Sequence, residues 1–313
     1  MKVRIGISSC LLGQKVRFDG GHKNCHFCLQ DLSPFVEYLS VCPEMAIGLP
    51  SPRPAIRLQQ TTANQIRLVQ SSDDSVEHTQ AMQQFIDAKL PLLEQLSGYI
   101  VCAKSPTCGM ERVKLYDDDG NVVSRQARGM FTHQLMQKYP WLPVEEDGRL
   151  SDPALRENFV CRVFSCHDFQ QSMQDGFSIA KLVAFHSRYK FLVMAHSPQA
   201  YRELGRLVAN SGVFSPQELQ QRYLNGLMQA LSNIATRKQH ANVLQHLQGF
   251  FKKQLSSEAR QELADVIHRY RQGFAPLLAP VTLLHHHLRQ FPQPYVAAQR
   301  YFSPYPEQLG LRG

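Results

Sequence analysis

The chain has 313 residues and a formal net charge of +8 at pH 7. This length favours two domains over one. An apolar content of 43% is sufficient for a packed core and argues against disorder. No apolar run reaches the roughly 18 residues that a membrane-spanning helix needs, and the N-terminal stretch lacks the pattern of a signal peptide. We therefore expect a cytoplasmic protein without a membrane partner.

Strand and helix patterns alternate through the first half of the chain, which predicts an α/β fold. We expect a Rossmann-like domain over residues 1–150, with a mainly parallel sheet and its functional loops at the carboxyl ends of the strands. In chain order, the sequence predicts a strand over 3–9, a short helix over 31–39, a strand that runs into 40–44, strand pieces within 51–69, a helix over 73–96, a strand over 99–103, a hairpin over 112–125 and a helix over 127–140.

A connector rich in proline, glycine and acidic residues, 140–153, marks the predicted domain boundary. Beyond it the pattern is helical, and we expect an all-α domain over residues 151–313. Residues 1–160 hold 17 Lys/Arg and 18 Asp/Glu, whereas residues 161–313 hold 17 and 8. This asymmetry favours a polyanionic partner for the second domain, and a merely solvated helical surface is the alternative.

Three of the eight cysteines follow predicted strands: Cys10, Cys42 and Cys108. Without a secretory signal a disulfide framework is disfavoured, which leaves reduced thiols, metal ligands or redox groups. Because the carboxyl ends of parallel strands meet at one edge of a sheet, we expect these thiols to converge. Three thiolates can hold an iron–sulfur cluster and leave one iron open to another ligand.

Five motifs together resemble the thiouracil desulfidase family, whose members use an iron–sulfur centre to remove sulfur from thiolated uracil. The motifs are SCLLG, RFDGGHK, VCPE, PRPAIRL and KSPTCG, within residues 1–150. The second half resembles the YbgA-type helical domain that is often fused to this family. Fusions of this kind resemble RNA desulfidases that act on 4-thiouridine in transfer RNA.

The resemblance implies a [4Fe-4S] cluster held by Cys10, Cys42 and Cys108, and a carboxylate base, Glu44, beside the open iron. Sulfur would pass to that iron and leave as hydrosulfide, without a redox change or a nucleotide cofactor. The other residues implied for the pocket are Ser105, Lys104 and Asp19 as catalytic groups, and Arg53 and Arg57 as substrate-binding groups.

The remaining cysteines have simpler interpretations. Cys25 and Cys28 form a C-x-x-C pair, for which zinc binding, thiol redox chemistry and a fourth cluster ligand stay open, although no role is favoured. The other three, Cys102, Cys161 and Cys166, are predicted to pack in the core. The histidine run 285–287 is predicted to be a solvated or RNA-facing patch.

Short stretches in the second half mix Lys and Arg with Tyr and His, a composition that can bind phosphates and stack on bases. We therefore predict a [4Fe-4S]-dependent desulfidase of 4-thiouridine in transfer RNA, with RNA bound by the basic domain. One alternative is a desulfidase of free thiouracil bases, in which the helical domain serves stability or dimerisation. Another is a non-catalytic zinc or iron–sulfur sensor that regulates RNA binding. The mixed stretches are 187–190, 235–240, 252–253 and 268–271.

Overall fold

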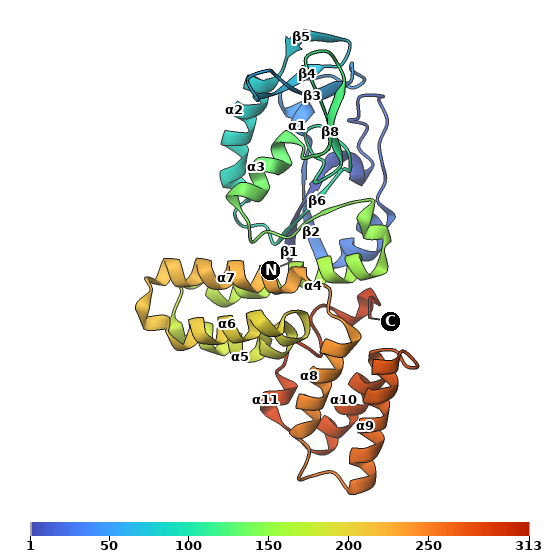
Figure 1. Cartoon of the computed structure of the whole chain (residues 1–313), viewed down its shortest axis with the longest axis vertical. Helices are drawn as coiled ribbons and strands as arrows, with labels where there is room; N and C mark the ends of the chain where they lie inside the picture. The colour runs from blue at the N-terminus through green and yellow to red at the C-terminus, as the bar shows by residue number, and fades with distance from the viewer. Residues whose placement is uncertain (1, 313) are drawn as a thin grey trace. The chain divides into compact units, whose positions relative to one another are not determined.

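The computed structural model describes residues 2–312 and divides into two compact units, one that ends at Phe159 and one that begins at Val160. Helix α4 (Pro153–Met173) contains the division. The first unit is α/β and the second is built from helices, which confirms the predicted fold class (Figure 1). Within the described residues, no helix has both the length and the apolar character needed to cross a bilayer.

Sheet A is a four-stranded, all-parallel sheet in the first unit. The inner strand formed by residues 3–8, called the centre strand below, pairs with a neighbour on each side. Ser8 lies opposite Val41, and Ile7 lies opposite Ile100. Gly6 is required in this strand because a Cβ there would lie 2.2 Å from the ring of the buried Tyr99. In spatial order the strands are β2 (Val36–Val41), β1 (Val3–Ser8), β6 (Gly98–Val101) and β9 (Val144–Glu146).

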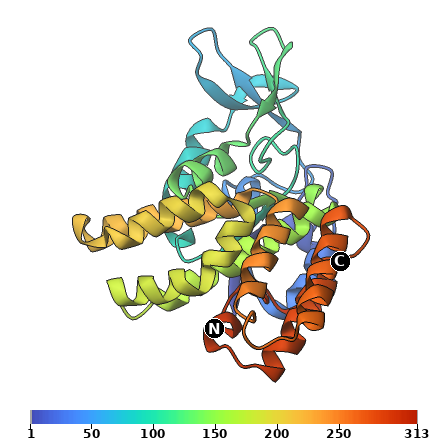
Figure 2. The ribbon, with the colours of Figure 1, turned by 60° about the horizontal axis from the view of Figure 1, so that its bottom comes forward.

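Sheet B is a separate, mixed sheet, and its separation from sheet A was not predicted from the sequence. Only β3 and β7 pair in parallel, and the other pairs are antiparallel. Figure 2 shows the β3–β4 and β7–β8 hairpins projecting away from the helices of this unit. The strands are β5 (Asp73–Glu77), β4 (Ile66–Gln70), β3 (Ile56–Gln60), β7 (Val113–Tyr116) and β8 (Val122–Ala127), in spatial order.

The helices of the first unit differ in part from the predictions. The helix expected over 73–96 is shorter, α2 (Thr79–Lys89), because residues 73–77 pair with β4 as a strand and Pro91 provides no backbone N–H. The helix expected over 31–39 is present only in its first part, as the end of a π-helix (Phe27–Leu32) and a 3-10 turn (Ser33–Phe35), because the chain extends at Val36 to pair with β1. The helix expected over 127–140 is present as α3 (Met130–Lys138), and a short α-helix, α1 (Pro43–Ala46), follows β2.

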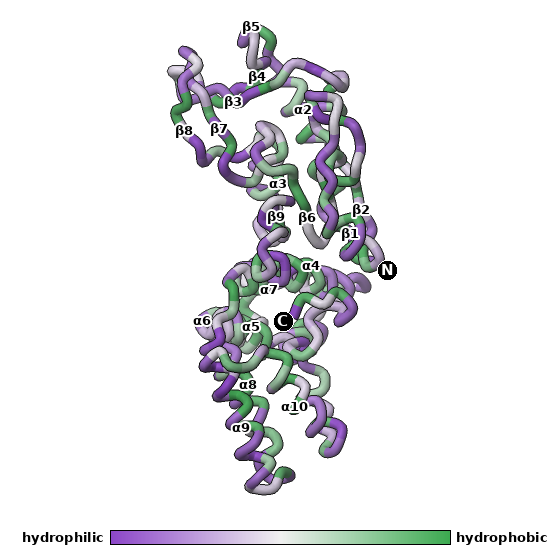
Figure 3. Tube along the Cα trace, turned by 90° about the vertical axis from the view of Figure 1, so that its right-hand side faces the viewer, coloured by the Kyte–Doolittle hydropathy of each residue, from purple (hydrophilic) through white to green (hydrophobic). Residues whose placement is uncertain are grey.

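The second unit packs amphipathic helices around its own core, and Figure 3 shows apolar and polar segments alternating along α8 and α9. Most of its helices begin at Ser or Thr side chains that accept a backbone N–H from the first turn, as at Ser178 and Thr236. The helices are α5 (Ile179–His196), α6 (Pro198–Ala209), α7 (Pro216–Ser232), α8 (Arg237–Gly249), α9 (Ser257–Gln272), α10 (Leu278–Gln290) and α11 (Pro294–Ala297).

Candidate functional site

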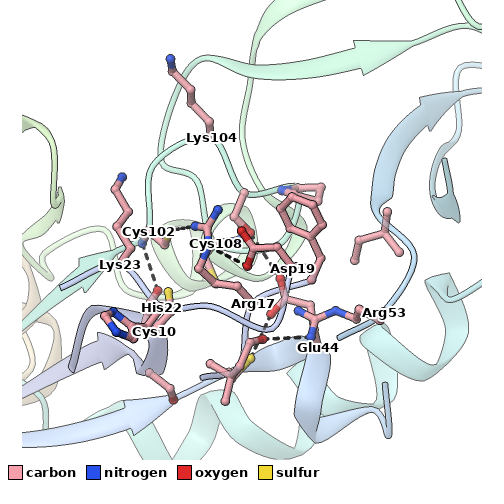
Figure 4. Close-up of a pocket in the computed structure, with 18 of the residues that line it drawn as sticks. Cys10, Arg17, Asp19, His22, Lys23, Glu44, Arg53, Cys102, Lys104 and Cys108 are labelled. Atoms are coloured by element: carbon pink, nitrogen blue, oxygen red, sulfur yellow. Dashed lines mark hydrogen bonds and ion pairs between the residues drawn. The ribbon is translucent and has the colours of Figure 1, made fainter. Parts of the chain in front are cut away.

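The carboxyl ends of β1, β2 and β6 open onto one cavity of about 670 Å³. Cys10 lies two residues past β1, Cys42 directly follows β2, and Cys108 lies in the loop after β6. All three line the cavity, together with Glu44. Cys10, Cys108 and Glu44 are labelled in Figure 4. Because β1 pairs in parallel with both β2 and β6, these loops leave sheet A at the same edge. The parallel topology therefore brings together thiols that are far apart in the sequence.

The loop of residues 14–24, called the flap loop below, is anchored near both of its ends by hydrogen bonds to Cys10. The Cys10 carbonyl accepts a hydrogen bond from the Gly13 N–H (3.3 Å) and another from the Lys23 N–H (2.9 Å). Gly13 has a φ of 84°, the left-handed conformation that glycine adopts without strain. The flap loop is therefore closed onto the turn that carries the first thiol.

Glu44 is the buried carboxylate of the cavity, with 8% of its surface exposed. It lies in the first turn of α1, for which Cys42 is the N-cap residue. Its Oε1 accepts hydrogen bonds from the hydroxyls of Thr107 (2.5 Å) and Ser105 (3.4 Å), and its Oε2 accepts one from the Cys42 thiol (3.3 Å). Glu44 is thus oriented beside a thiol, where it can take or give a proton.

The loop that carries Cys108 is held by a serine hydroxyl and by close backbone packing. The Ser105 Oγ accepts hydrogen bonds from the backbone N–H groups of Thr107 (3.3 Å) and Cys108 (3.1 Å). The Gly129 N–H donates to the Gly109 carbonyl (2.7 Å). A Cβ at Gly129 would lie 2.5 Å from the Thr107 backbone, so only glycine allows this approach. Ser105 therefore positions both the third thiol and the carboxylate.

The surroundings of the three thiols favour their protonated form. A hydrogen bond with Cys102, followed by burial, raises the pKa of Cys10. Burial raises the pKa of Cys108, and burial together with the charge of Glu44 raises the pKa of Cys42 to about 12. Since metals bind thiolates, a metal centre here would displace the three protons.

Cys102 is buried as predicted, but the interpretation as a core residue alone is incomplete. It lines the cavity, where its thiol shares a hydrogen bond with Cys10 and lies 4.0 Å from the Arg17 Nη1. Its backbone N–H donates to the Ser8 hydroxyl (3.0 Å). Four of the eight cysteines therefore face one cavity.

Asp19 and Arg53 both line the cavity. The Arg53 Nη1 donates to the Val16 carbonyl (2.9 Å), so its guanidinium supports the flap loop. Asp19 accepts a hydrogen bond from the Gly21 N–H (2.9 Å) and pairs with Arg17 (3.5 Å). The Gly21 hydrogen bond and the charge of Arg17 lower the pKa of Asp19.

Of the two remaining predicted pocket residues, Lys104 lines the cavity. Lys104 is exposed at the rim, with a φ of 64°, and its side chain points away from the other labelled residues in Figure 4. Arg57 does not line the cavity and lies 5.2 Å from the ring centroid of Tyr116. Successive side chains of a strand point to opposite faces, and Ile56 takes the cavity side of β3.

Several residues of the site were not predicted. Thr107, which contacts Glu44, and Phe18, which lines the cavity, lie inside the quoted motifs, but their residue types carried no signal of their own. Lys23 lines the cavity and forms an ion pair of 2.7 Å with Asp147, whose side chain is 8% exposed. Asp147 follows β9 and belongs to no motif, so only the three-dimensional structure reveals this contact.

The other cysteines lie away from the cavity lining. Cys25 and Cys28 are buried and share a hydrogen bond, so they form a separate thiol pair. Cys161 and Cys166 are buried in α4. Among residues 2–312, no three His, Cys, Asp or Glu side chains are grouped so that they could hold a single metal ion.

The structure of the second unit contradicts part of the predicted RNA-binding surface. Tyr189 and Tyr270 are 1% and 4% exposed, so they cannot provide the base stacking that the composition of stretches 187–190 and 268–271 suggested. His287 is 4% exposed and is therefore not part of a solvated or RNA-facing patch. The cationic side chains remain available. Exposed examples are Arg202, Arg206, Lys238, Lys252, Lys253, Arg269, Arg271 and Arg289.

Comparison with known families agrees with the division of the chain. Residues 5–147 match the family model described as 2-thiouracil desulfurase, and residues 190–306 match DUF1722, described as a protein of unknown function. Over 157 residues, the chain is 34% identical to the uncharacterized protein YbgA of Escherichia coli (strain K12). This alignment covers 50% of the chain and 93% of YbgA. The chain belongs to the family of YbgA, and its residues 5–147 form a region that matches 2-thiouracil desulfurase. Its DUF1722 region follows the desulfurase domain.

A solved structure, the [4Fe-4S]-dependent thiouracil desulfidase TudS, is 28% identical to the chain. The similarity covers 51% of the chain and 100% of TudS, with a TM-score of 0.40.

Proposed function

We propose that the chain is a [4Fe-4S]-dependent desulfidase that converts 4-thiouridine in transfer RNA to uridine. The observation that carries this proposal is the meeting of three thiols, Cys10, Cys42 and Cys108, with the buried Glu44 carboxylate in one cavity. The match of residues 5–147 to the family model described as 2-thiouracil desulfurase supports the chemistry. The net reaction is a hydrolysis in which a C=S bond and water give a C=O bond and hydrogen sulfide, so no electrons are exchanged.

The donor set of the cavity fits an iron–sulfur cluster. Cysteine thiolates are the usual ligands of these clusters, and three of them leave one iron of a four-iron cluster without a protein ligand. Cys10, Cys42 and Cys108 come from three different loops around a cavity of about 670 Å³. When bound, such a cluster would supply a Lewis acid for the thiocarbonyl and an acceptor for its sulfur.

Glu44 is the group of this chain best placed to move protons. As a base, it would remove a proton from the water that adds to the ring carbon, and it would return that proton to the departing sulfur. Thr107 and Ser105 hydrogen-bond one oxygen of the carboxylate and set its orientation. Burial excludes bulk water, which makes these contacts stronger than they would be in solvent.

The basic second unit supports an RNA substrate. Residues 161–313 carry nine more Lys/Arg than Asp/Glu, and many of these cations are exposed. Phosphate contacts from such residues provide affinity that is independent of base sequence and decreases steeply with salt. In this proposal the second unit binds the RNA and the first unit carries out the chemistry.

A free thiolated base is the second candidate substrate. The description of the matching family names 2-thiouracil, which favours this alternative. The two candidates differ in whether the cations of the second unit contribute to turnover.

The direct test is anaerobic incubation of the iron-loaded full-length chain with thiolated transfer RNA and, separately, with free 4-thiouracil. Loss of the thiocarbonyl absorbance and release of sulfide are the expected results. Glu44→Gln should keep its iron, while its kcat falls about 10²- to 10⁴-fold, the usual contribution of a general base. Failure of the wild type to release sulfide from either substrate would refute the proposal, and a fully active Glu44→Gln would refute the role of Glu44.

A charge reversal in the second unit distinguishes the two candidate substrates. Lys252→Glu combined with Lys253→Glu should lower kcat/KM for transfer RNA. It should also reduce the slope of log(kcat/KM) against log salt concentration by about two, whereas kcat/KM for free 4-thiouracil should stay unchanged. The control is Lys138→Glu, an exposed lysine of the first unit. Equal activity of the double variant and the wild type on transfer RNA would favour the free base.

A further inference from the structure

The Phe18 side chain is the one aromatic ring in the lining of the cavity among the described residues, apart from the imidazole of His22. It is 47% exposed, whereas Glu44 and the thiols of Cys10 and Cys108 in the same lining are buried. The remaining apolar lining includes Ile56 and Pro106. The cavity therefore combines buried thiols and a buried carboxylate with apolar side chains and an accessible ring.

Phe18 is held on a fixed backbone. The Arg53 N–H donates to the Phe18 carbonyl (2.9 Å), and the Arg53 Nη1 donates to the Val16 carbonyl (2.9 Å). The Ser51 hydroxyl lies within hydrogen-bond distance of the carbonyls of Lys15 (2.8 Å) and Arg17 (3.1 Å). Four consecutive carbonyls of the flap loop thus have partners in one neighbouring segment. The backbone that carries the ring is therefore held in place before any ligand enters.

One face of the Phe18 ring is already covered. The Arg17 guanidinium lies over it, 5.7 Å from the ring centroid, and is itself paired with Asp19. A cation over one face is a favourable contact for an aromatic ring. Because the side chain is still about half exposed, the ring keeps surface for a second flat partner.

We propose that Phe18 is the stacking platform for the pyrimidine ring of the substrate and orients its thiocarbonyl toward the thiols and Glu44. This inference rests on the proposed function, since a thiolated pyrimidine is the flat ligand concerned. Every base has a π-face, so stacking holds the ring without hydrogen bonds to its edge. The edge of the base is then free to face the reacting groups.

The first test measures kcat and KM for free 4-thiouracil with the iron-loaded full-length chain. Phe18→Ala should raise KM about 5- to 150-fold, the effect of losing one base–aromatic stack. Phe18→Leu should behave like Phe18→Ala, because it is apolar but has no π-face, and Phe18→Trp should keep a low KM. The control is Leu92→Ala, which removes an apolar side chain that is 67% exposed. A wild-type KM in Phe18→Ala or Phe18→Leu would overturn the inference.

The second test does not depend on turnover. The chain has one tryptophan, Trp141, so Phe18→Trp combined with Trp141→Phe places the only indole at the proposed platform. Binding of 4-thiouracil should quench its emission saturably, because the thiocarbonyl absorbs in that range. Saturable quenching without sulfide release from the wild type would retain the platform and refute the proposed function. Sulfide release from the wild type without quenching would refute the platform alone.

Discussion

The Thr107 hydroxyl donates a hydrogen bond of 2.5 Å to the Oε1 of Glu44. Thr107 is fully buried and Glu44 nearly so, so this bond replaces a water that the carboxylate would otherwise bind. Thr107 lies next to Cys108 in the chain, whereas Glu44 follows Cys42 by two residues. One hydrogen bond therefore joins the loops of two thiols and orients the carboxylate between them.

Thr107→Val removes this donor and keeps the shape of the side chain. Hydrogen bonds to charged groups contribute about 1.5–3 kcal/mol, so we expect kcat for a thiolated pyrimidine to fall about 10- to 150-fold, with iron content unchanged. Steady-state kinetics and iron analysis measure the two quantities. Thr62→Val, at an exposed hairpin tip, is the control. An unchanged kcat would show that Thr107 has no part in orienting Glu44.

Substitution of the cavity cysteines separates ligands from neighbours. Cys10→Ser, Cys42→Ser and Cys108→Ser should each reduce the iron retained after anaerobic reconstitution, because each removes one thiolate of three. Cys102→Ala is the matched control, a buried cavity thiol in contact with Cys10, and it should keep its iron. Loss of iron from Cys102→Ala as complete as from Cys42→Ser would make Cys102 a ligand.

Two histidines should make the second unit sensitive to acid. Burial lowers the pKa of His196 to about 4 and that of His240 to about 3. In the unfolded chain their pKa is about 6.5, so below this pH the unfolded state binds protons that the folded state excludes. Their contribution to stability is complete above about pH 6.5 and is lost as the pH falls toward 4, by about 1.4 kcal/mol per pH unit for each histidine.

Urea unfolding followed by circular dichroism at several pH values measures this slope. His240→Asn should be less stable than the wild type at neutral pH but should show a flatter decline between pH 6.5 and 4. A slope equal to that of the wild type would show that His240 does not titrate on unfolding.

Gly6→Ala tests the packing of the centre strand of sheet A. The new Cβ would lie 2.2 Å from the Tyr99 ring, and since Tyr99 is buried, the ring cannot move without disturbing the core. Overpacking of this kind costs about 1–3 kcal/mol, so the midpoint of thermal unfolding should fall. Gly249→Ala, at the end of α8 with no atom near the added Cβ, should leave it unchanged or raise it slightly. Equal midpoints for Gly6→Ala and the wild type would contradict this account.

The sequence was sufficient for the features that depend on local pattern. Runs rich in apolar residues predicted β1 and β6, and the change to a helical pattern after residue 153 predicted the all-α second unit. The convergence of Cys10, Cys42 and Cys108 on one cavity follows from their places after parallel strands, which a linear pattern can show.

Features that depend on which way a side chain faces could not be predicted in this way. Tyr189 and Tyr270 occur among cations in the sequence, but the turn of their helices directs them into the core. Arg57 alternates with Ile56 along a strand and so lies on the other face. The ion pair of Lys23 with Asp147 joins residues more than a hundred positions apart, and no local pattern encodes it.

The order of strands in sheet A determines when the cavity can form during synthesis. The centre strand, β1, is made first, and its neighbour β6 follows about ninety residues later. Contacts between such distant segments form late, because a long loop must close before they are made. The three thiols therefore cannot meet on a nascent chain that lacks β6. A cofactor that needs all of them can be bound only after Cys108 has been made, so its insertion is a late step in the maturation of this unit.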